Sequence, residues 1–407
     1  MLWANFFHIY QPPNWSPRII RKVVKEAYRP LLVILKKHPA IKITLNINGS
    51  LTEQLHEYGF DDVINNIKLL AKRHQIELTG SALYHPLLPL LPTNEITRQI
   101  KLNSAINKKY FGRTYNPRGF FPPEMAYSSR VAKVVEKLHF RWILIDEISH
   151  NGKRASTSFD TSYRIKGTKL RVVFRNTIIS DHLNFSTPIK KPSIFWQKIA
   201  QDDRSHTALV TAMDGEVLGH HRPGLDKLWQ VLVTDRVIST ITISKLIKEY
   251  KTTKSITPRR ASWASRAVEL KKNIPYLLWD DPSNPIHHDQ WELLQRTITL
   301  VNKKVNHPHY ATARALLDKR MASDQFWWAS AKPWWSLAII KRKAKELVAI
   351  SSLLENKNDW AIKLGNNIIK NSTSWQKKLI FKKTAAKYLK SGVTDRIRFI
   401  GGKRISN

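Results

Sequence analysis

The chain has 407 residues, and its 68 lysines and arginines outnumber its 31 aspartates and glutamates to give a formal net charge of +37. Hydrophobic residues make up 42% of the chain, enough to bury a core, which excludes an intrinsically disordered protein. There is no cysteine, which excludes disulfides, thiolate zinc sites and cysteine nucleophiles. The excess of positive charge predicts attraction to polyanions such as nucleic acid or anionic lipid.

The N-terminal residues have the pattern of a strand that begins almost at once. Residues 1–8 contain no basic stretch followed by an apolar region, so we do not expect a signal peptide. No apolar run reaches about 18 residues, so neither a transmembrane helix nor a membrane partner is expected. From these two expectations we interpret the protein as cytoplasmic.

Short apolar runs alternate with longer amphipathic segments over the first half of the chain. The seven candidate strands are Leu2–Tyr10, Ile43–Ile47, Ile76–Leu83, Gly119–Phe121, Trp142–Ile145, Leu170–Phe174 and Ala208–Met213. Between strands, apolar residues recur at helical spacings of three and four over Arg18–Lys37, Thr52–His74, Asn94–Tyr110 and Ser129–Leu138. Strands separated by helical crossovers pair in parallel, and seven of them fit a closed barrel better than an open sheet. We therefore predict an α/β fold built on a seven-stranded parallel β/α barrel.

Two residues set more local expectations for these helices. Pro30 lies inside the helix expected at residues 18–37, and it should break or kink that helix. Ser129 stands at the start of the helix expected at residues 129–138, where its side chain should act as the N-terminal cap.

The pattern becomes mostly helical beyond about residue 222. Amphipathic helices are expected at Asp289–Asn306, Ala311–Met321, Lys332–Leu354, Trp360–Ile369 and Thr373–Lys390. We divide the chain into a catalytic barrel at residues 1–260, a helical region at residues 261–390 that contributes to the active-site cleft, and a basic tail at residues 391–407. Four tryptophans lie within residues 327–335, where most should pack in the core and some could face a groove.

Most of the expected strands end in polar residues. His8 lies near the end of the first strand and Gln11 follows it, Asn46 lies near the end of the second, and Asp214 follows the seventh. In a parallel α/β barrel the active site lies at the carboxyl ends of the strands. Polar residues that recur at this position therefore predict a functional site there.

Glu124 is unusual because it lies in an aromatic and proline-rich strand end, at residues 119–127. Burying a carboxylate there is costly unless the group is paired or used in chemistry. A salt bridge to one of the many arginines explains the residue as well as catalysis does.

Asp214 and Glu216 follow an apolar run and precede His220 and His221, with two glycines that permit tight turns. Aspartate and histidine are common metal ligands, so a metal site is one interpretation. However, the side chains of two adjacent histidines diverge on most backbones. A capped turn with solvated acids is the simpler alternative.

Two carboxylates on separate strand ends are also what glycoside hydrolysis requires. One carboxylate attacks the anomeric carbon and the other protonates the leaving oxygen, at a separation of about 5–5.5 Å in retaining enzymes. The 14 tryptophans and 12 tyrosines offer faces that can stack on sugar rings, although most tryptophans of any protein lie in its core.

Several of these segments together resemble glycoside hydrolase family 57, the retaining α-glucan-active enzymes. Residues 7–13 resemble its first motif, His-x-His-Gln-Pro, with His8 at the first histidine and Tyr10 where the second is expected. Residues 75–80 resemble the second motif, with Glu77 as its acidic member, and continue into the similar segment 84–91, which contains His85.

The remaining motifs follow in the family's order. Residues 119–127 resemble the third motif, although Phe121 stands where a tryptophan is frequent, and the resemblance implies that Glu124 is the nucleophile. Residues 214–221 resemble the fourth, which implies that Asp214 is the general acid/base. Segments 174–181 and 262–265 are also similar to family sequences. The resemblance covers residues 1 to about 350 and implies a seven-stranded β/α barrel with a helical C-terminal part, no metal and no cofactor.

What the resemblance implies is double displacement on an α-glucan or maltooligosaccharide by an enzyme of the amylase or 4-α-glucanotransferase type. The residues expected to contact substrate or orient the carboxylates are His8, Gln11, Glu77, His85, Arg175, Asp181, His220 and Trp263. Hydrolysis and transfer to another sugar are not distinguished by the sequence.

Two alternatives remain at this point. A metal-dependent polysaccharide deacetylase on a related barrel would need a clustered Asp-His-His site. A basic nucleic-acid-binding protein would explain the charge, although no recognised nucleic-acid-binding motif occurs in the sequence. Residues 331–407 contain 18 lysines and arginines against 4 acids, so nonspecific polyanion binding is expected of the basic C-terminal region.

Overall fold

The computed structural model describes residues 1–13, 15–204, 207–356 and 358–390, so the expected basic tail at 391–407 lies outside the described residues. The described chain forms two compact units. The first contains Met1–Leu83 and Pro92–Ala267, and the second contains Tyr84–Leu91 and the chain from Val268 onward. Over these residues, no helix has both the length and the apolar character that crossing a membrane requires.

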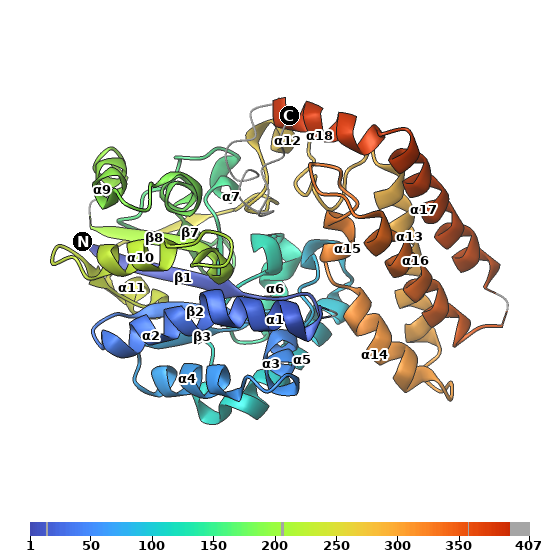
Figure 1. Ribbon diagram of the computed structural model, residues 1–407, viewed down its shortest axis with the longest axis horizontal. Coiled ribbons are helices and arrows are strands. Elements are labelled where there is room, and N and C mark those ends of the chain that lie inside the picture. The colour runs from blue at the N-terminus through green and yellow to red at the C-terminus, as the bar shows by residue number, and fades with distance from the viewer. Residues whose placement is uncertain (14, 205–206, 357, 391–407) are drawn as a thin grey trace. The chain divides into compact units, whose positions relative to one another are not determined.

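The first unit is an α/β structure with two sheets, in which most neighbouring strands are parallel (Figure 1). One sheet has the order β3-β2-β1-β8, and β9 also pairs with β1. Its strands are β1 (Leu2–Ile9), β2 (Ile43–Ile47), β3 (Ile76–Thr79), β8 (Ala208–Asp214) and β9 (Ser239–Thr240). The other sheet has the order β10-β6-β7-β5-β4, from β4 (Gly119–Phe120), β5 (Trp142–Asp146), β6 (Ser162–Ile165), β7 (Arg171–Arg175) and β10 (Thr253–Ile256).

The seven strands expected from the sequence correspond to β1 to β5, β7 and β8, but a closed seven-stranded barrel is not confirmed. The two sheets meet at a bridge between Gly80 and Phe120 and at a hydrogen bond from Asn176 N–H to Val210 O (2.8 Å), without continuous strand pairing. One reason is that β4 has only two residues. The strands β6, β9 and β10 were not expected, because they are short and mostly polar, and β6 is antiparallel to β7.

Alternate residues of β1 face opposite sides of its sheet, and both sides are buried. Trp3, Phe7 and Ile9 belong to a large hydrophobic cluster that also contains residues of the helices α1, α2, α4 and α10. Figure 1 shows helices α1, α2 and α10 near β8, β1 and β2. Because side chains alternate along a strand, Phe6 and His8 face the opposite side from this cluster. There the Phe6 ring stacks on the ring of Phe121, with centroids 5.1 Å apart.

The helices of the first unit are α1 (Pro17–Val23), α2 (Arg29–Lys37), α3 (Gly49–Glu57), α4 (Asp61–Lys72), α5 (Thr93–Phe111), α6 (Ser129–Lys137), α7 (Ile148–Asn151), α8 (Thr177–Asp181), α9 (Pro192–Ala200), α10 (Leu225–Val233) and α11 (Ile243–Glu249). The short helix α12 (Ala267–Lys271) spans the change of unit along the chain. As expected, Pro30 disturbs the first helix: a π-helical segment, η1 (Val24–Tyr28), joins α1 to α2, which begins one residue before the proline.

Two local expectations for these helices were wrong. The segment 52–74 is not one helix, because Gly59 adopts a left-handed conformation (φ 76°) that ends α3, and Phe60 N–H donates to Leu55 O (2.7 Å) across the turn. The N-terminal cap of α6 is Ser128, whose hydroxyl accepts from Val131 N–H (3.3 Å), because Ser129 is already the first helical residue.

The second unit is helical, with α13 (Pro285–Lys303), α14 (Tyr310–Arg320), α15 (Asp324–Trp327), α16 (Leu337–Ser352), α17 (Asp359–Lys377) and α18 (Ile380–Lys390). Helices α13, α16 and α17 pack against one another and run side by side in Figure 1. The break expected near residue 370 occurs instead after Lys377. The four clustered tryptophans are all half-buried and pack on other aromatic rings; those of Trp327 and Trp334 stack at 4.4 Å.

Candidate functional site

Polar side chains gather at the carboxyl ends of β1, β2 and β8. In the strand register His8 lies opposite Asn46 on one side and opposite Asp214 on the other. His8 faces away from the helix-packed hydrophobic cluster, and paired residues in neighbouring strands point to the same face. The register therefore brings Asp214, the predicted acid/base, beside His8 at the end of the sheet.

His8 is buried, and its Nδ1 lies 2.8 Å from Asn46 Oδ1. The Asn46 amide nitrogen in turn donates to Thr79 Oγ1 (3.2 Å), which fixes the amide oxygen toward the histidine. Burial lowers the pKa of His8 to about 4, although the Asn46 hydrogen bond acts in the opposite direction. The ring is therefore neutral near pH 7, with its proton on Nδ1 and an acceptor at Nε2.

Glu124 lies on the turn that follows β4, after Pro122, whose backbone is extended, and Pro123, which begins a 3-10 helical turn. Its φ of 61° is left-handed, a conformation that costs a non-glycine residue roughly 1–3 kcal/mol and occurs mainly where the surroundings enforce it. Here they do so through the segment around Trp263. Trp263 N–H donates to the Glu124 carbonyl (3.2 Å), and Tyr127 N–H donates to Ala261 O (2.8 Å).

The carboxylate of Glu124 is held by the same segment. Trp263 Nε1–H donates to Glu124 Oε2 over 2.8 Å, and the carboxylate is half-buried. A donor aimed at an ionised carboxylate stabilises and orients it. Glu124 is therefore held at a strand end by Trp263, and both residues were predicted from the sequence to belong to the site.

A cluster of aromatic rings extends from His8 to the tryptophan that holds Glu124. The His8 ring lies 4.6 Å from that of Phe121 and 6.5 Å from that of Trp263, and the Phe121 and Trp263 rings meet edge to face at 6.0 Å. His8 thus contacts the tryptophan that holds Glu124 and is the strand partner of Asp214. His8 is therefore related to both predicted catalytic residues, to Asp214 by strand pairing and to Glu124 through Trp263.

The turn after Asp214 depends on two glycines. A Cβ on Gly215 would lie 2.5 Å from the Ile9 side chain, and Gly219 combines a φ of 112° with a Cβ position 2.0 Å from the Glu26 carbonyl oxygen. Any larger residue would push this turn away from β1 and η1. The glycine pattern that the sequence displays is therefore required by close packing beside Asp214.

Glu216 is buried, unlike the solvated acid that the simplest interpretation of this turn implied. Its Oε1 accepts from Tyr10 N–H (3.1 Å), from Gln11 Nε2 (3.1 Å) and from the hydroxyl of Tyr28. Burial raises the pKa of Glu216, and these donors oppose that shift. Gln11, predicted to bind substrate, is thus engaged in fixing the end of β1. Tyr28 was missed, because nothing in the sequence connects it to a residue 188 positions away.

His220 and His221 do not form a metal site in the described structure. His220 Nδ1 lies 2.6 Å from Glu26 Oε2, and burial, assisted by His220, lowers the pKa of His221 to about 4. Within the described ranges, one group of three side chains has the spacing of metal ligands, and it belongs to the helical unit: His288, Asp289 and Glu292. The described residues therefore do not support the clustered Asp-His-His site that a deacetylase would need.

Arg175 and Asp181 are brought together, as the resemblance implied. A guanidinium nitrogen of Arg175 donates to Asp181 Oδ1, its Nε lies 3.3 Å from Asp146 Oδ2, and the guanidinium carbon lies 5.8 Å from the centre of the Trp263 ring. The arginine is buried, and its charge is balanced by the two acids. Its guanidinium lies over the ring of the tryptophan that holds Glu124. Asp146 was missed although it ends β5, the position that selected other candidates.

Glu77 is placed away from the strand ends. It pairs with Thr44, two residues before the level of His8, Asn46 and Thr79, and its carboxylate accepts from Thr44 Oγ1 (3.3 Å) and Ser244 N–H (3.0 Å). Burial raises its pKa, and the hydrogen bonds oppose the shift. These contacts make Glu77 a half-buried group that caps the start of α11. They differ from the expected contacts with substrate hydroxyls.

His85 belongs to the helical unit, to which the segment Tyr84–Leu91 contributes. It is buried there, with a φ of 55°, and its Nδ1 lies 3.2 Å from Ser323 Oγ. Ser323 N–H also donates to the His85 carbonyl (3.1 Å). The described contacts of His85 thus anchor this segment to the start of α15.

Comparison with known proteins relates this site to a family. A family model described as glycosyl hydrolase family 57 matches residues 4–258. An alpha-amylase of Pyrococcus horikoshii is 27% identical over 247 residues, which cover 59% of this chain and 38% of the relative. A 4-alpha-glucanotransferase of Thermococcus litoralis is 22% identical over 254 residues, which cover 60% of this chain and 38% of the relative. The chain therefore matches well under half the length of these relatives.

Solved structures have the same fold at low sequence identity. The Thermococcus litoralis 4-alpha-glucanotransferase matches with a TM-score of 0.68 at 17% identity, covering 87% of this chain and 60% of that one. A branching enzyme from Pyrococcus horikoshii matches with a TM-score of 0.67 at 17% identity, covering 91% of this chain and 94% of that one. Since the family model spans more than half of the chain, and includes Glu124 and Asp214, this protein belongs to glycosyl hydrolase family 57, as the sequence motifs predicted.

Proposed function

We propose that the protein is a retaining enzyme acting on α-glucans, a hydrolase or transglycosylase of the amylase or 4-α-glucanotransferase type. The observation that carries the proposal is the position of Glu124, which lies on a strained turn and accepts a hydrogen bond from Trp263 Nε1 at 2.8 Å. The ring of Trp263 contacts His8, whose strand partner is Asp214. Relatives named as alpha-amylase and 4-alpha-glucanotransferase support the same substrate class.

In the proposed reaction, Glu124 attacks the anomeric carbon while Asp214 gives its proton to the leaving glycosidic oxygen. The C–O bond to the leaving sugar breaks as the bond to Glu124 forms, which gives a glycosyl–enzyme ester. Asp214, now ionised, removes a proton from the incoming hydroxyl, which displaces Glu124 and restores both carboxyl groups. Water as acceptor gives hydrolysis, and a sugar hydroxyl gives transfer.

The neighbouring groups have roles that fit this reaction. His8, which burial keeps neutral, is proposed to contact a sugar hydroxyl, and Trp263 fixes the nucleophile through its indole N–H while its half-buried ring contributes to sugar binding. Arg175 lies over that ring, and its ion pairs with Asp146 and Asp181 keep the guanidinium in place. We also propose that the seven parallel strands act as one barrel-like scaffold around this site.

The test is incubation of the protein with maltooligosaccharides and amylose, followed by analysis of product chain lengths. Shorter chains alone indicate hydrolysis, and redistributed lengths indicate transfer. Glu124→Gln should abolish turnover, because an amide cannot form the ester, while circular dichroism remains unchanged. Near wild-type turnover by this variant on every active glucan would refute the assignment.

Azide provides a sharper test of the nucleophile. In Glu124→Ala, azide can occupy the space of the lost carboxylate and attack the same face of the anomeric carbon. With a substrate that carries a good leaving group, it should restore activity and give a glycosyl azide of inverted configuration. In Asp214→Ala, azide should not produce this inverted product, because the nucleophile is still present.

A further inference from the structure

Two buried acids follow one another at the end of β5. Asp146 and Glu147 are at most 1% exposed, and an unpaired carboxylate at such a position would be costly. Thr177 contacts both acids: its hydroxyl donates to Asp146 Oδ2 (2.8 Å), and its N–H donates to Glu147 Oε1 (3.0 Å). Up to this point the two carboxylates have similar surroundings.

The two acids pair with different arginines. Asp146 Oδ2 lies 3.3 Å from Nε of Arg175, which is also its partner in the register of β5 and β7. Glu147 Oε2 accepts from Arg204 Nη1 (2.5 Å). The side chain of Arg175 is 3% exposed and that of Arg204 is 13% exposed, so water and salt screen both pairs poorly. A comparison of the two pairs therefore separates a specific role of Asp146 from the general effect of a buried charge.

The aromatic ring that each arginine contacts distinguishes the two pairs. The guanidinium carbon of Arg175 lies 5.8 Å from the centre of the Trp263 ring, whereas that of Arg204 lies 5.5 Å from the centre of the Phe159 ring. A cation over an aromatic face is attracted by the ring. Trp263 Nε1–H in turn donates to Glu124 Oε2 (2.8 Å). The Asp146 pair therefore reaches Glu124 through one ring, and the Glu147 pair leads to a phenylalanine.

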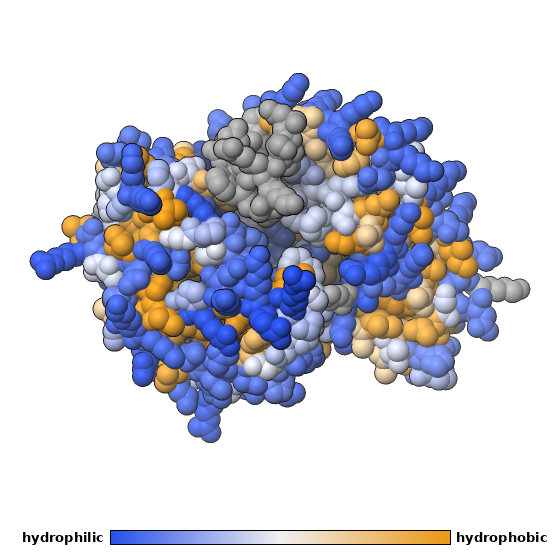
Figure 2. All heavy atoms as spheres, in the orientation of Figure 1, coloured by the Kyte–Doolittle hydropathy of each residue, from blue (hydrophilic) through white to orange (hydrophobic). Residues whose placement is uncertain are grey.

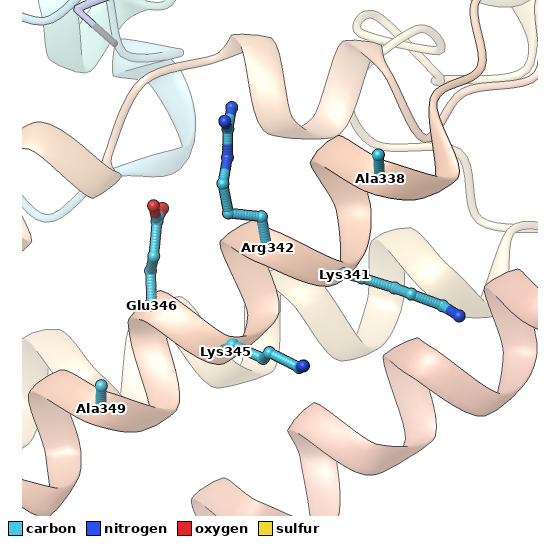
Figure 3. A pocket seen from close by; sticks show the side chains of 6 residues that line it. All are labelled: Ala338, Lys341, Arg342, Lys345, Glu346 and Ala349. Carbon is cyan, nitrogen blue, oxygen red and sulfur yellow. The ribbon is translucent and has the colours of Figure 1, made fainter.

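The charged side chains drawn on α16 of the helical unit show no comparable convergence. Figure 3 shows Lys341 and Lys345 extending to one side of this helix, and Arg342 and Glu346 extending to another. These four side chains share no common target. The arrangement around Trp263 differs because buried charges from β5 and β7 meet over one ring.

We propose that Asp146 is a positioning residue for Glu124, acting through Arg175 and Trp263. The proposal rests on the proposed function only for the role of Glu124 as nucleophile. Asp146 lies at Nε of the guanidinium, and Asp181 accepts from one of its Nη atoms, so the planar group is held at two points. A fixed cation restrains the indole beneath it and keeps its N–H directed at the carboxylate, where alignment determines the strength of the hydrogen bond.

Of these two acids, Asp146 is the one that water screens less. Asp181 is 18% exposed and also lies 3.8 Å from Nη1 of a second arginine, Arg154, so it is shared. On the other side of the Trp263 ring system, the nearest described histidine is His8, with ring centroids 6.5 Å apart, and burial keeps it neutral. Loss of Asp146 should therefore loosen the guanidinium most.

The experiment follows the indole N–H signal of Trp263 by proton–nitrogen correlation NMR of the full chain during a pH titration. Trp263→Phe identifies the signal, and Glu124→Gln shows whether its pH dependence reports Glu124. The test variant is Asp146→Asn. The matched control is Glu147→Gln, which neutralises the neighbouring buried acid and affects Arg204 instead. Thermal unfolding confirms that each variant folds.

A milder pair of variants keeps both charges. Thr177→Val removes the hydroxyl that donates to Asp146 (2.8 Å), and Thr157→Val removes the one that donates to Glu147 (3.2 Å). Valine has nearly the shape of threonine, so these variants test the same contrast if a charge variant does not fold. The expected effect of Thr177→Val has the same direction as that of Asp146→Asn and is smaller.

We expect the midpoint of the titration to rise by about half a pH unit or more in Asp146→Asn, which is about a threefold change in proton affinity. The reason is that a carboxylate that loses an aligned donor is more easily protonated. The midpoint should stay unchanged in Glu147→Gln. A fall in Asp146→Asn would overturn the proposal, because removal of a nearby negative charge by itself favours ionised Glu124.

Three other results would also overturn the proposal: an unchanged midpoint in Asp146→Asn, an equal rise in Glu147→Gln, and a titration that persists in Glu124→Gln. The NMR measurement needs no substrate. A protein that turns over no glucan but shows the expected midpoints would therefore refute the proposed function and leave the positioning role of Asp146 intact. On an active glucan, the acidic limb of the kcat/KM profile should move in the same direction as the midpoint.

Discussion

Trp263 contacts several parts of the candidate site. Its indole nitrogen and backbone both bond Glu124, its ring contacts His8 and Phe121, and the Arg175 guanidinium lies over it. The tryptophan therefore links the carboxylate on one strand end to the ion pairs on another. Replacement of the ring should affect the reaction even where the fold is kept.

Trp263→Phe keeps an aromatic ring but removes the donor to Glu124. A hydrogen bond to a charged group contributes about 1.5–3 kcal/mol, so we expect kcat/KM on maltooligosaccharides to fall about 10- to 100-fold. The matched control is Trp335→Phe, which removes the indole donor to Gln376 Oε1 (2.7 Å) in the helical unit. Equal activity of the two variants in steady-state assays would show that the Glu124 hydrogen bond does not matter.

His287 offers a test of charge burial in the helical unit. Its Nε2–H donates to Phe326 O (2.8 Å), and its Nδ1 accepts from Asp281 N–H (3.1 Å), so the neutral ring satisfies both partners. Burial lowers its pKa to about 4. The unfolded chain takes up this proton near pH 6.5, and the folded chain only near pH 4.

Between these two pH values the unfolded state binds more protons, so His287 reduces stability as the pH falls. Relative to His287→Asn, the wild type should lose up to about 3 kcal/mol of unfolding free energy between pH 6.5 and pH 4. Urea denaturation at a series of pH values measures this difference. His287→Gln, which also cannot titrate, should give the same slope as His287→Asn. Parallel curves for wild type and both variants would contradict the prediction.

At the scale of elements, the packing of the turn η6 (Gly215–Val217) and its neighbours against η1 sets the end of β8. Gly219 follows this turn, and its backbone approaches the Glu26 carbonyl so closely that a Cβ would lie 2.0 Å from that oxygen. Gly59, between α3 and α4, has a similar left-handed φ of 76° but nothing within 4 Å of a Cβ. A comparison of the two positions therefore separates the cost of a left-handed backbone from the cost of close packing.

Gly59→Ala should cost about 1 kcal/mol, since it adds only the strain of a left-handed alanine. Gly219→Ala should cost about 3 kcal/mol or more, because η6 and η1 must also move apart. The midpoint and slope of urea unfolding, followed by tryptophan fluorescence, provide both values. Equal costs at the two positions would mean that the contact with Glu26 yields without penalty.

At the scale of the whole molecule, the net charge of +37 acts on the folded state itself. Figure 2 shows hydrophilic side chains over most of the visible face, with hydrophobic ones in smaller groups. Excess charge of one sign repels itself and destabilises a compact chain, and salt screens this repulsion. The Debye length falls from about 30 Å at 0.01 M salt to about 8 Å at 0.15 M.

The temperature of half-unfolding should therefore rise as sodium chloride increases from 0.01 to about 0.15 M. The rise should be smaller in Lys363→Gln/Lys370→Gln/Lys387→Gln, whose net charge is three units lower. Differential scanning calorimetry measures both. A fall with salt would mean instead that exposed ion pairs such as Arg29–Asp62, whose side chains are more than two-fifths exposed, dominate the electrostatics.

Some of this molecule could be determined from the sequence alone. Short apolar runs separated by helical stretches placed the seven main strands, and the order of four motifs identified the family before any geometry was known. Glu124 was selected because burying a carboxylate at such a strand end is costly without a purpose, and the resemblance then implied that Glu124 and Asp214 form the catalytic pair. Local rules failed where neighbours competed, as when Ser128 rather than Ser129 capped α6.

Only the tertiary structure decided which polar residues meet. The sequence treated Glu77, Gln11 and His8 alike, yet strand register places Glu77 two residues below the strand end, and Glu216 engages Gln11. Contacts with residues far away in the chain determine the roles of Asp146, Tyr28 and Asn46. The physical reason is that periodicity fixes which face a side chain takes, whereas its partners depend on the pairing of distant segments.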